Sequence, residues 1–311
     1  MIVFQSLRFH RAAAATVAAV MTLALSVSMT HAQQAYPSPE DAAAALAAAV
    51  KTGTKSAILK VLGRGAGEVV ESGDDVADAE TRQRFLTAYD AKHSVKAEAN
   101  KKATLILGAD DFPFPIPLVN SKSGWEFDAP AGRLEILYRR IGRNELDAIQ
   151  TCLAFVDAQN EYAEKDRTGD GVGVYAQRVV SSPGKKDGLF WRDDRDPSPL
   201  GELAAQASAE GYKVGDQTAP YHGYYFRILK GQGPDAPGGA FYYVVKGKMI
   251  GGFALIAYPA EYGNSGVMTF MVNHAGTVYQ KDLGRRTEII VKRINLFDPD
   301  QTWKKVDVLT P

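Results

Sequence analysis

The strongest constraint on this chain is a helical pattern in its middle, from Arg133 to about Lys165. Its apolar residues recur at spacings of four, eight, four and three, so they share one face of a helix: Leu137, Ile141, Ile149, Leu153 and Val156. If unbroken, such a helix would be roughly 50 Å long. Gly142, with Asn144 as a candidate cap, predicts a break there. The apolar stripe needs a partner surface in which to be buried.

The residues after Ser181 predict that partner surface. A short helix near 203–210 leads into strands at 223–229, 241–246, 249–258, 266–272 and 277–281, separated by Gly-, Asn- and Pro-rich turns. Phe253, Leu255 and Ala257 alternate on one strand and would face the helix. With a last helix near 288–296, residues 133–311 form a predicted domain in which a long helix packs on an antiparallel meander.

The residues before this helix predict a different arrangement. Helices are expected from Pro39, capped by Ser38, and over 55–62 and 77–93. Short strands follow at 95–98, 103–107, 112–119 and 125–128; alternating prolines at 113, 115 and 117 place the third at an edge or a bulge. The glycine-rich stretch 63–73 reads as a helix-ending loop. Residues 36–130 therefore predict helices on a small curved antiparallel sheet, cone-like in form. The whole chain is predicted to be α+β.

Charge and cysteine content exclude several classes of protein. The 311 residues contain 36 basic and 36 acidic side chains, which is not the basic footprint of a nucleic-acid binder. One cysteine allows neither an intrachain disulfide nor a cysteine-based zinc site. Apolar neighbours make Cys152 a predicted core thiol rather than a reactive one.

The first 32 residues have the pattern of a secretory signal peptide. Arg8 and Arg11 precede an apolar run over 12–29, and Thr30 and Ala32 occupy the positions that signal peptidase reads. We expect cleavage before Gln33; the alternative is an uncleaved membrane anchor. The mature chain would be periplasmic or secreted. It would carry 34 basic and 36 acidic residues and no long apolar stretch that could span a membrane.

Several long segments resemble a bacterial family of uncharacterised exported proteins, domain-of-unknown-function family 2950. They are residues 110–117, 139–146, 251–262, 267–273 and, above all, Tyr221–Leu229. The resemblance covers essentially the whole mature chain. It implies no activity, substrate or catalytic residue.

The C-terminal half also resembles the heads of type IV pilins and pseudopilins, in which a long helix packs on an antiparallel sheet. The resemblance rests on the helix ending in 158–162 and on the strands at 252–258, 265–270 and 276–279. The chain has no prepilin-peptidase motif, and Arg139, Arg140, Arg143 and Glu145 interrupt what would be the membrane-embedded half of the helix. Only the head fold is therefore implied, not filament assembly.

One loop has the spacing of a calcium site. Asp166, Thr168 and Asp170 would supply oxygens at its first, third and fifth positions, with Gly171 at the sixth. The twelfth position is Gln177, which cannot supply the bidentate carboxylate. A polar turn is the favoured interpretation, and calcium binding stays open.

The histidines offer two further candidates. Asp90 and His93 lie three residues apart near a helix end, where they could form an acid/base pair or an exposed surface pair. His222, among Tyr221, Tyr224 and Tyr225, reads as packing or a rim, or as a ligand surface. The charged run 192–196 reads as a solvated loop.

These patterns favour an exported, non-enzymatic protein with a binding or scaffolding role. Its partner would be an envelope protein or an extracellular ligand, and we expect no catalytic residue, cofactor or metal. The alternative is a small-molecule-binding protein or enzyme that uses a pocket in the N-terminal cone-like domain, with Asp90 and His93 as the acid/base pair.

Overall fold

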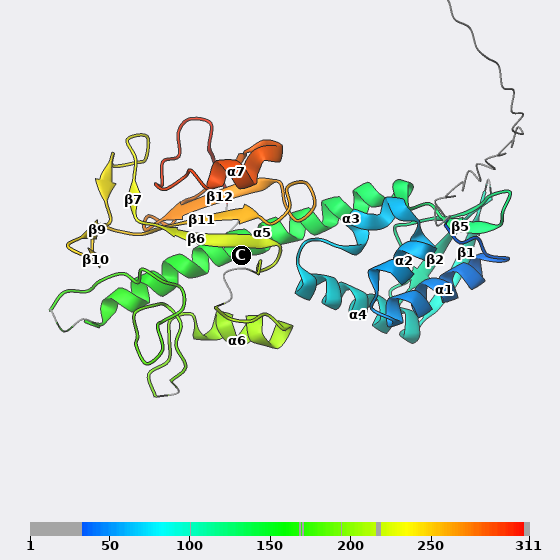
Figure 1. Cartoon of the computed structure of the whole chain (residues 1–311), viewed down its shortest axis with the longest axis horizontal. Helices are drawn as coiled ribbons and strands as arrows, with labels where there is room; N and C mark the ends of the chain where they lie inside the picture. Colours follow the sequence, from blue (N-terminus) through cyan, green and yellow to red (C-terminus); the bar gives the residue numbers. More distant parts are fainter. Residues whose placement is uncertain are drawn as a thin grey trace, which may run out of the picture. The chain divides into compact units, whose positions relative to one another are not determined.

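The computed structural model describes residues 33–99, 101–167, 169, 171–193, 195–215 and 219–307 (Figure 1). Gln33–Pro311 forms one compact unit. Helices and antiparallel sheets occur together, so the fold is α+β, as predicted. Among the residues described, none of the helices is both long and apolar enough to cross a bilayer. The predicted signal segment lies outside these residues.

The N-terminal part consists of short helices followed by a small sheet. The helices are α1 Pro39–Lys51, α2 Lys55–Leu62, the 3-10 turn η1 Arg64–Ala66, α3 Gly67–Val70 and α4 Asp75–Ala91. The predicted cap of α1 is confirmed, because the Ser38 hydroxyl accepts the backbone N–H of Asp41 at 3.0 Å. Gly63 ends α2 with φ +87°, as predicted. The prediction of a loop over 63–73 is wrong, because η1 and α3 lie within that range.

The N-terminal sheet has the order β1–β2–β4–β5, all antiparallel, and β3 pairs with β2. Its strands are β1 His93–Glu98, β2 Lys102–Leu107, β3 Phe112–Pro113, β4 Leu118–Asn120 and β5 Trp125–Phe127. The proline-rich segment splits into the two short strands β3 and β4. Pro113 on β3 lies opposite Ile106 on β2. Leu46, Leu105 and Phe127 are buried between this sheet and the helices.

Helix α5, Ala129–Glu164, is the longest element and continues without a break. The prediction that it starts near Arg133 and breaks at Gly142 is wrong. The helix starts at Ala129, four residues earlier, with Asp128 as its cap, and the Asn144 amide donates to the Ser265 carbonyl at 2.9 Å. A glycine inside a helix costs only about 1 kcal/mol. The hydrogen bonds of Arg140 and Asn144, which lie on either side of Gly142 in the sequence, offset this cost.

The C-terminal sheet has the order β14–β13–β12–β11–β6 and is antiparallel throughout, as predicted. The predicted strand 241–246 is not part of it, because β6 pairs directly with β11. Its strands are β6 Tyr224–Leu229, β11 Ala254–Pro259, β12 Met268–Asn273, β13 Val278–Asp282 and β14 Lys304–Lys305. Two-stranded pairs join β7 Gly231–Gln232 to β8 Phe241–Tyr242, and β9 Val244–Val245 to β10 Lys248–Met249. The remaining helices are α6 Gly201–Glu210, η2 Gly284–Arg286 and α7 Thr287–Val291.

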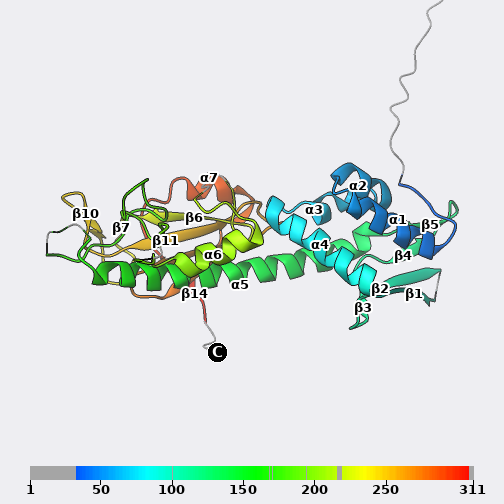
Figure 2. The ribbon, with the colours of Figure 1, turned by 90° about the horizontal axis from the view of Figure 1, so that it is seen from below.

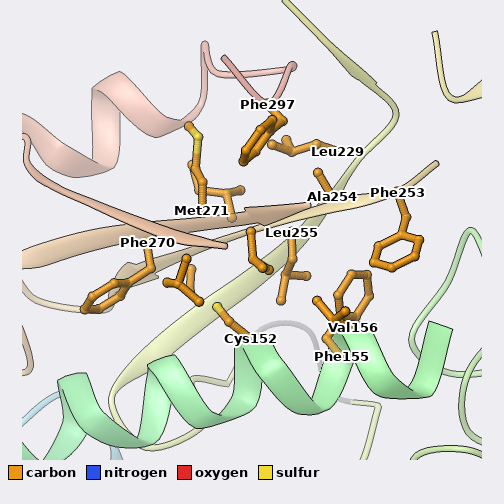
Figure 3. Packing of buried hydrophobic residues seen from close by; sticks show 14 of the residues in the cluster. Cys152, Phe155, Val156, Leu229, Phe253, Ala254, Leu255, Phe270, Met271 and Phe297 are labelled. Carbon is orange, nitrogen blue, oxygen red and sulfur yellow. The ribbon is translucent and has the colours of Figure 1, made fainter. Parts of the chain in front are cut away.

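Helix α5 covers one face of this sheet, and α7 with its following segment covers the other (Figures 1 and 3). Leu255 and Phe270 point from the sheet toward α5, whereas Met271 points toward Phe297 on the opposite face (Figure 3). The α5 stripe is centred on Cys152, which is 0% exposed; the predicted stripe residue Leu153 is only half-buried. The predicted core thiol is confirmed, and burial raises the pKa of Cys152 to about 12.

A buried polar network joins the N-terminal helices to the C-terminal sheet. The Arg140 guanidinium of α5 donates to the carbonyls of Glu68 (2.6 Å) and Val69 (2.7 Å) and to the Asn264 side-chain oxygen (2.6 Å). The Asn264 amide in turn donates to the Glu71 carbonyl at 2.9 Å. The hydrophobic clusters lie on either side of this network; the division into domains 36–130 and 133–311 stays a prediction.

We predict that Phe270→Ala lowers the free energy of unfolding by roughly 3–5 kcal/mol, because it leaves a cavity in the core under α5. Leu146→Ala is the control; that side chain is 64% exposed on α5, and a change within about 0.5 kcal/mol is expected. Urea denaturation with an unchanged slope measures both values. Equal losses in the two variants would contradict the position of Phe270 in the core.

Candidate functional site

An apolar cavity of about 170 Å³ lies between α5, α6 and the sheet strands β6 and β11. Five aromatic rings line it: Phe155, Phe190, Tyr212, Tyr221 and Phe226. An engineered apolar cavity of about 150 Å³ in another protein binds benzene, so this volume is enough for one ring or a short hydrocarbon chain.

Helix α6 forms the roof of the cavity because its small residues face inward. Leu203, Ala204 and Ala207 share one helix face and line the cavity, while Ala205 is exposed on the other side. Alanine side chains leave the space that larger residues would fill. Gly211, with φ +102°, ends the helix and turns the chain back along the rim.

The rim residue Tyr212 is fixed by a buried carboxylate from the N-terminal part. Its hydroxyl donates to Asp74 Oδ2 at 2.9 Å, and the backbone N–H of Gly223 donates to the same oxygen at 2.8 Å. The other oxygen accepts the N–H groups of Val76 and Ala77, both at 3.1 Å, and so caps α4. Burial and the neighbouring Asp74 raise the pKa of Tyr212 above that of a free tyrosine. Asp74 therefore connects the start of α4 to the cavity rim.

A histidine lies between two carboxylates, one at the end of α6 and one on α5. His222 Nε2 lies 3.1 Å from the Glu210 carboxylate at the end of α6, and Nδ1 lies 3.6 Å from the Asp147 carboxylate on α5. Burial raises the pKa of Asp147, while His222 and Arg143 act in the opposite direction. The His222 ring also contacts rim residue Tyr221, with centroids 4.2 Å apart.

His222 is held in this position by a strained turn. His222 and Gly223 have φ values of +48° and +74°, and Tyr221 and Tyr224 exchange backbone hydrogen bonds across them. This is the geometry of a two-residue hairpin turn, where asparagine or glycine is the usual first residue. A Cβ at Gly223 would lie 2.5 Å from the Asn144 amide nitrogen, so the second position requires glycine. Of the two open interpretations for His222, the structure places it in the rim packing.

Asp90 and His93, the proposed acid/base pair, are both exposed: Asp90 lies in the last turn of α4, and His93 is the first residue of β1. Asp90 pairs with Lys51 at 3.3 Å, and His93 Nδ1 is 2.8 Å from the Tyr89 carbonyl. The His93 ring stacks on Tyr89 with centroids 3.8 Å apart. The structure therefore gives the two side chains separate partners.

In the calcium-like loop, Thr168 and Asp170 lie outside the described residues, so the choice between a polar turn and a calcium site stays open. The Asp166 carboxylate accepts the backbone N–H groups of Gly169 (2.9 Å) and Gly171 (2.6 Å), and the Gln177 amide donates to a carbonyl at residue 247. Within the part of the chain that the structure describes, no three His, Cys, Asp or Glu side chains gather as a metal site would require.

The described residues of the charged run 192–196 lie in a loop, as predicted, and two of its acids form ion pairs with lysines. Lys186 donates to Asp193 and Asp196, and hydrogen bonds from Lys186 and Lys165 lower the pKa of Asp196 to about 2. Trp191, just before the run, stacks on the guanidinium of Arg167 at 4.6 Å. Sequence reasoning did not find this cluster, because Lys165 and Arg167 are distant in sequence from their partners Asp196 and Trp191.

The family model described as "Protein of unknown function (DUF2950)" matches residues 33–306. The chain belongs to this family. No curated protein and no solved structure gives a significant match, and the resemblance to pilin heads stays a prediction. Because the DUF2950 description carries no activity, the functional argument rests on the cavity and its rim.

We predict that Tyr212→Phe lowers the free energy of unfolding by about 1.5–3 kcal/mol near pH 7, because it removes a hydrogen bond to a buried carboxylate. Tyr138→Phe, at a side chain 69% exposed, is the control and should change nothing.

The pH dependence gives a second test of the same contact. The pKa of Tyr212 is higher in the folded protein than the value of 10.0 for a free tyrosine. Its contribution to stability is therefore complete below pH 10 and is lost as the pH rises toward the pKa in the folded protein. The difference between the wild type and Tyr212→Phe should therefore narrow above pH 10. Denaturation curves at neutral and alkaline pH measure it; a constant difference would show that Tyr212 does not donate to Asp74.

Proposed function

We propose that this protein is an exported binding protein that takes a small apolar ligand into the cavity under α6. The observation that carries the proposal is a preformed cavity with almost entirely apolar walls. Helix α6 covers it, and the small alanine side chains of that helix do not fill it. Ligand sites are typically concave, mostly apolar and largely preformed.

The lining favours a ligand with an aromatic ring. Rings at positions such as Phe155 and Phe226 offer edge and face contacts, which add to the gain from burying apolar surface. Lys213 is the one charged residue among the described lining residues, and it is exposed. The ligand is therefore uncharged, or carries an anionic group at the mouth of the cavity.

The rim favours binding rather than catalysis. Both ring nitrogens of His222 face carboxylates, so the imidazole acts within the protein rather than on a bound molecule. The sequence alternative placed a pocket near Asp90 and His93, whereas this cavity belongs to the C-terminal part.

Export rests on the signal-peptide pattern of residues 1–32. The family match begins at residue 33, where the mature chain is expected to start, which supports this assignment. A free thiol is tolerated in an oxidising compartment when it is buried, as Cys152 is.

Filling the cavity should weaken binding. We predict that Ala204→Leu weakens the binding of a small aromatic probe, p-cresol, by about tenfold, because overpacking a site costs roughly 1–3 kcal/mol. Ala205→Leu adds the same atoms to the exposed face of the same helix and should bind as the wild type does. Saturation-transfer NMR measures both. Equal binding by the two variants, or no binding by the wild type, would exclude this cavity as the site.

The export proposal has its own measurement. Mass spectrometry of the protein recovered from the producing bacterium should find a chain that begins at Gln33. A chain that still carries residues 1–32 would contradict the export proposal and would leave the proposal of ligand binding in the cavity unaffected.

A further inference from the structure

A second pocket lies beside the apolar cavity. It has a volume of about 520 Å³ and is lined by residues 180–186, 190–193 and Val214, and we call it the loop pocket. Phe190 and Val214 line both spaces, so the two meet at these side chains. Both side chains are only half-buried, so the boundary is open to solvent and one bound molecule can occupy both spaces. Figures 1 and 2 both show the segment between α5 and α6, drawn in green, next to the beginning of α6.

A short ladder of backbone hydrogen bonds forms a wall that the two spaces share. The N–H of Phe190 donates to the Val179 carbonyl at 2.8 Å, and the N–H of Ser181 donates to the Phe190 carbonyl at 2.9 Å. Successive side chains of such an extended segment point to opposite sides. Val179 accordingly lines the cavity, whereas Val180 lines the loop pocket. This common wall fixes the distance between the two spaces.

The lining of the loop pocket has an excess of positive charge. It includes the cations Lys185, Lys186 and Arg192 and one acid, Asp193. Lys186 is already neutralised, because its amine donates to Asp193 at 2.9 Å and to Asp196 at 2.8 Å. Lys185 and Arg192 are exposed, and neither forms an ion pair with an acid among the described residues. Two cations of the lining are therefore available to a ligand.

The other acids described in this region have partners of their own and do not line the loop pocket. Asp187 accepts the backbone N–H of Ser182 at 2.7 Å and the hydroxyl of the same residue at 2.9 Å. Asp196 accepts a second hydrogen bond, from Lys165, at 2.9 Å. Asp194 lies outside the described residues. The charge that the described lining presents to a ligand is therefore positive.

A fixed aromatic ring gives the loop pocket a rigid side. The indole N–H of Trp191 donates to the Asp196 carbonyl at 2.7 Å, and the ring stacks on the guanidinium of Arg167, 4.6 Å away. Because these contacts hold the ring in place, the pocket is preformed, and an anionic group can bind without ordering this side chain.

We propose that the ligand of this protein is an amphipathic carboxylate, with an aromatic ring or short hydrocarbon chain in the cavity and its carboxylate in the loop pocket beside Lys185 and Arg192. The inference rests on the proposed function and adds the anionic half of the ligand. Burial of the apolar half supplies most of the affinity. The cations distinguish a carboxylate from a neutral group and attract it before it binds. Lys213, an exposed residue of the cavity lining, adds to this attraction.

The test compares carboxylates with neutral alcohols of the same shape. The pairs are hydrocinnamate with hydrocinnamyl alcohol, and phenylvalerate with the alcohol of the same chain length. They are titrated by saturation-transfer NMR into the chain that starts at Gln33, the compact unit of the structure. We expect at least one carboxylate to bind about tenfold more tightly than its alcohol, the effect of two exposed ion pairs. The difference should shrink as salt is added.

Single substitutions locate the carboxylate. Lys185→Gln and Arg192→Gln should each weaken binding of the carboxylate about threefold and leave binding of the alcohol unchanged. Arg195→Gln is the matched control, because Arg195 is an exposed cation of the same loop that does not line the pocket, and it should bind both probes as the wild type does. Thermal unfolding checks that each variant is folded.

The remaining outcomes separate this inference from the proposed function. Equal affinity for every carboxylate and its alcohol would overturn the anionic half and leave the binding of an apolar ligand intact. No binding of any probe would overturn both. If Lys213→Gln removed the preference for the carboxylate and the loop-pocket variants did not, the anionic group would lie at the cavity mouth, and the loop pocket would be excluded.

Discussion

The buried guanidinium of Arg140 is the interaction on which the rest of the structure depends. Burial lowers its pKa, and a charge taken out of water is tolerated only with hydrogen-bond partners arranged around it. Those partners are the carbonyls of Glu68 and Val69 from the N-terminal helices and the Asn264 side chain from the loop before β12. One side chain of α5 thus sets the position of the helix relative to both hydrophobic clusters.

The cavity follows from that placement. One turn beyond Arg140, Asn144 holds the Ser265 carbonyl, and a further turn brings Asp147 opposite His222. Once α5 is fixed, its next turns present Thr151 and Phe155 as the cavity floor. Two polar contacts then position α6 over the cavity. His222 lies next to Glu210 at the end of α6, and Asp74 accepts a hydrogen bond from Tyr212, just after the helix. The rim is therefore built from polar contacts although the space inside is apolar.

Local signals in the sequence predicted much of the fold but little of the site. Ser38 before Pro39 and the turns of the meander act over a few residues, so their structures could be read directly. Gly142 and Asn144 led to the wrong prediction of a helix break. The Asn144 amide instead donates to the carbonyl of Ser265, which is distant in sequence and which no local pattern reveals. The cavity escaped for the same reason: its walls come from segments between residues 151 and 255, and alanines on α6 give no motif.

The fully buried sulfur of Cys152 can report how often the interface between α5 and the sheet opens. A thiol reagent can reach it only when α5 separates from the sheet, so the rate of chemical labelling measures how often that interface opens. The high pKa adds a second barrier, because the thiolate that reacts is scarce while the core is closed. Without any introduced probe, the labelling rate can show whether a bound ligand makes opening of the interface between helix and sheet less frequent.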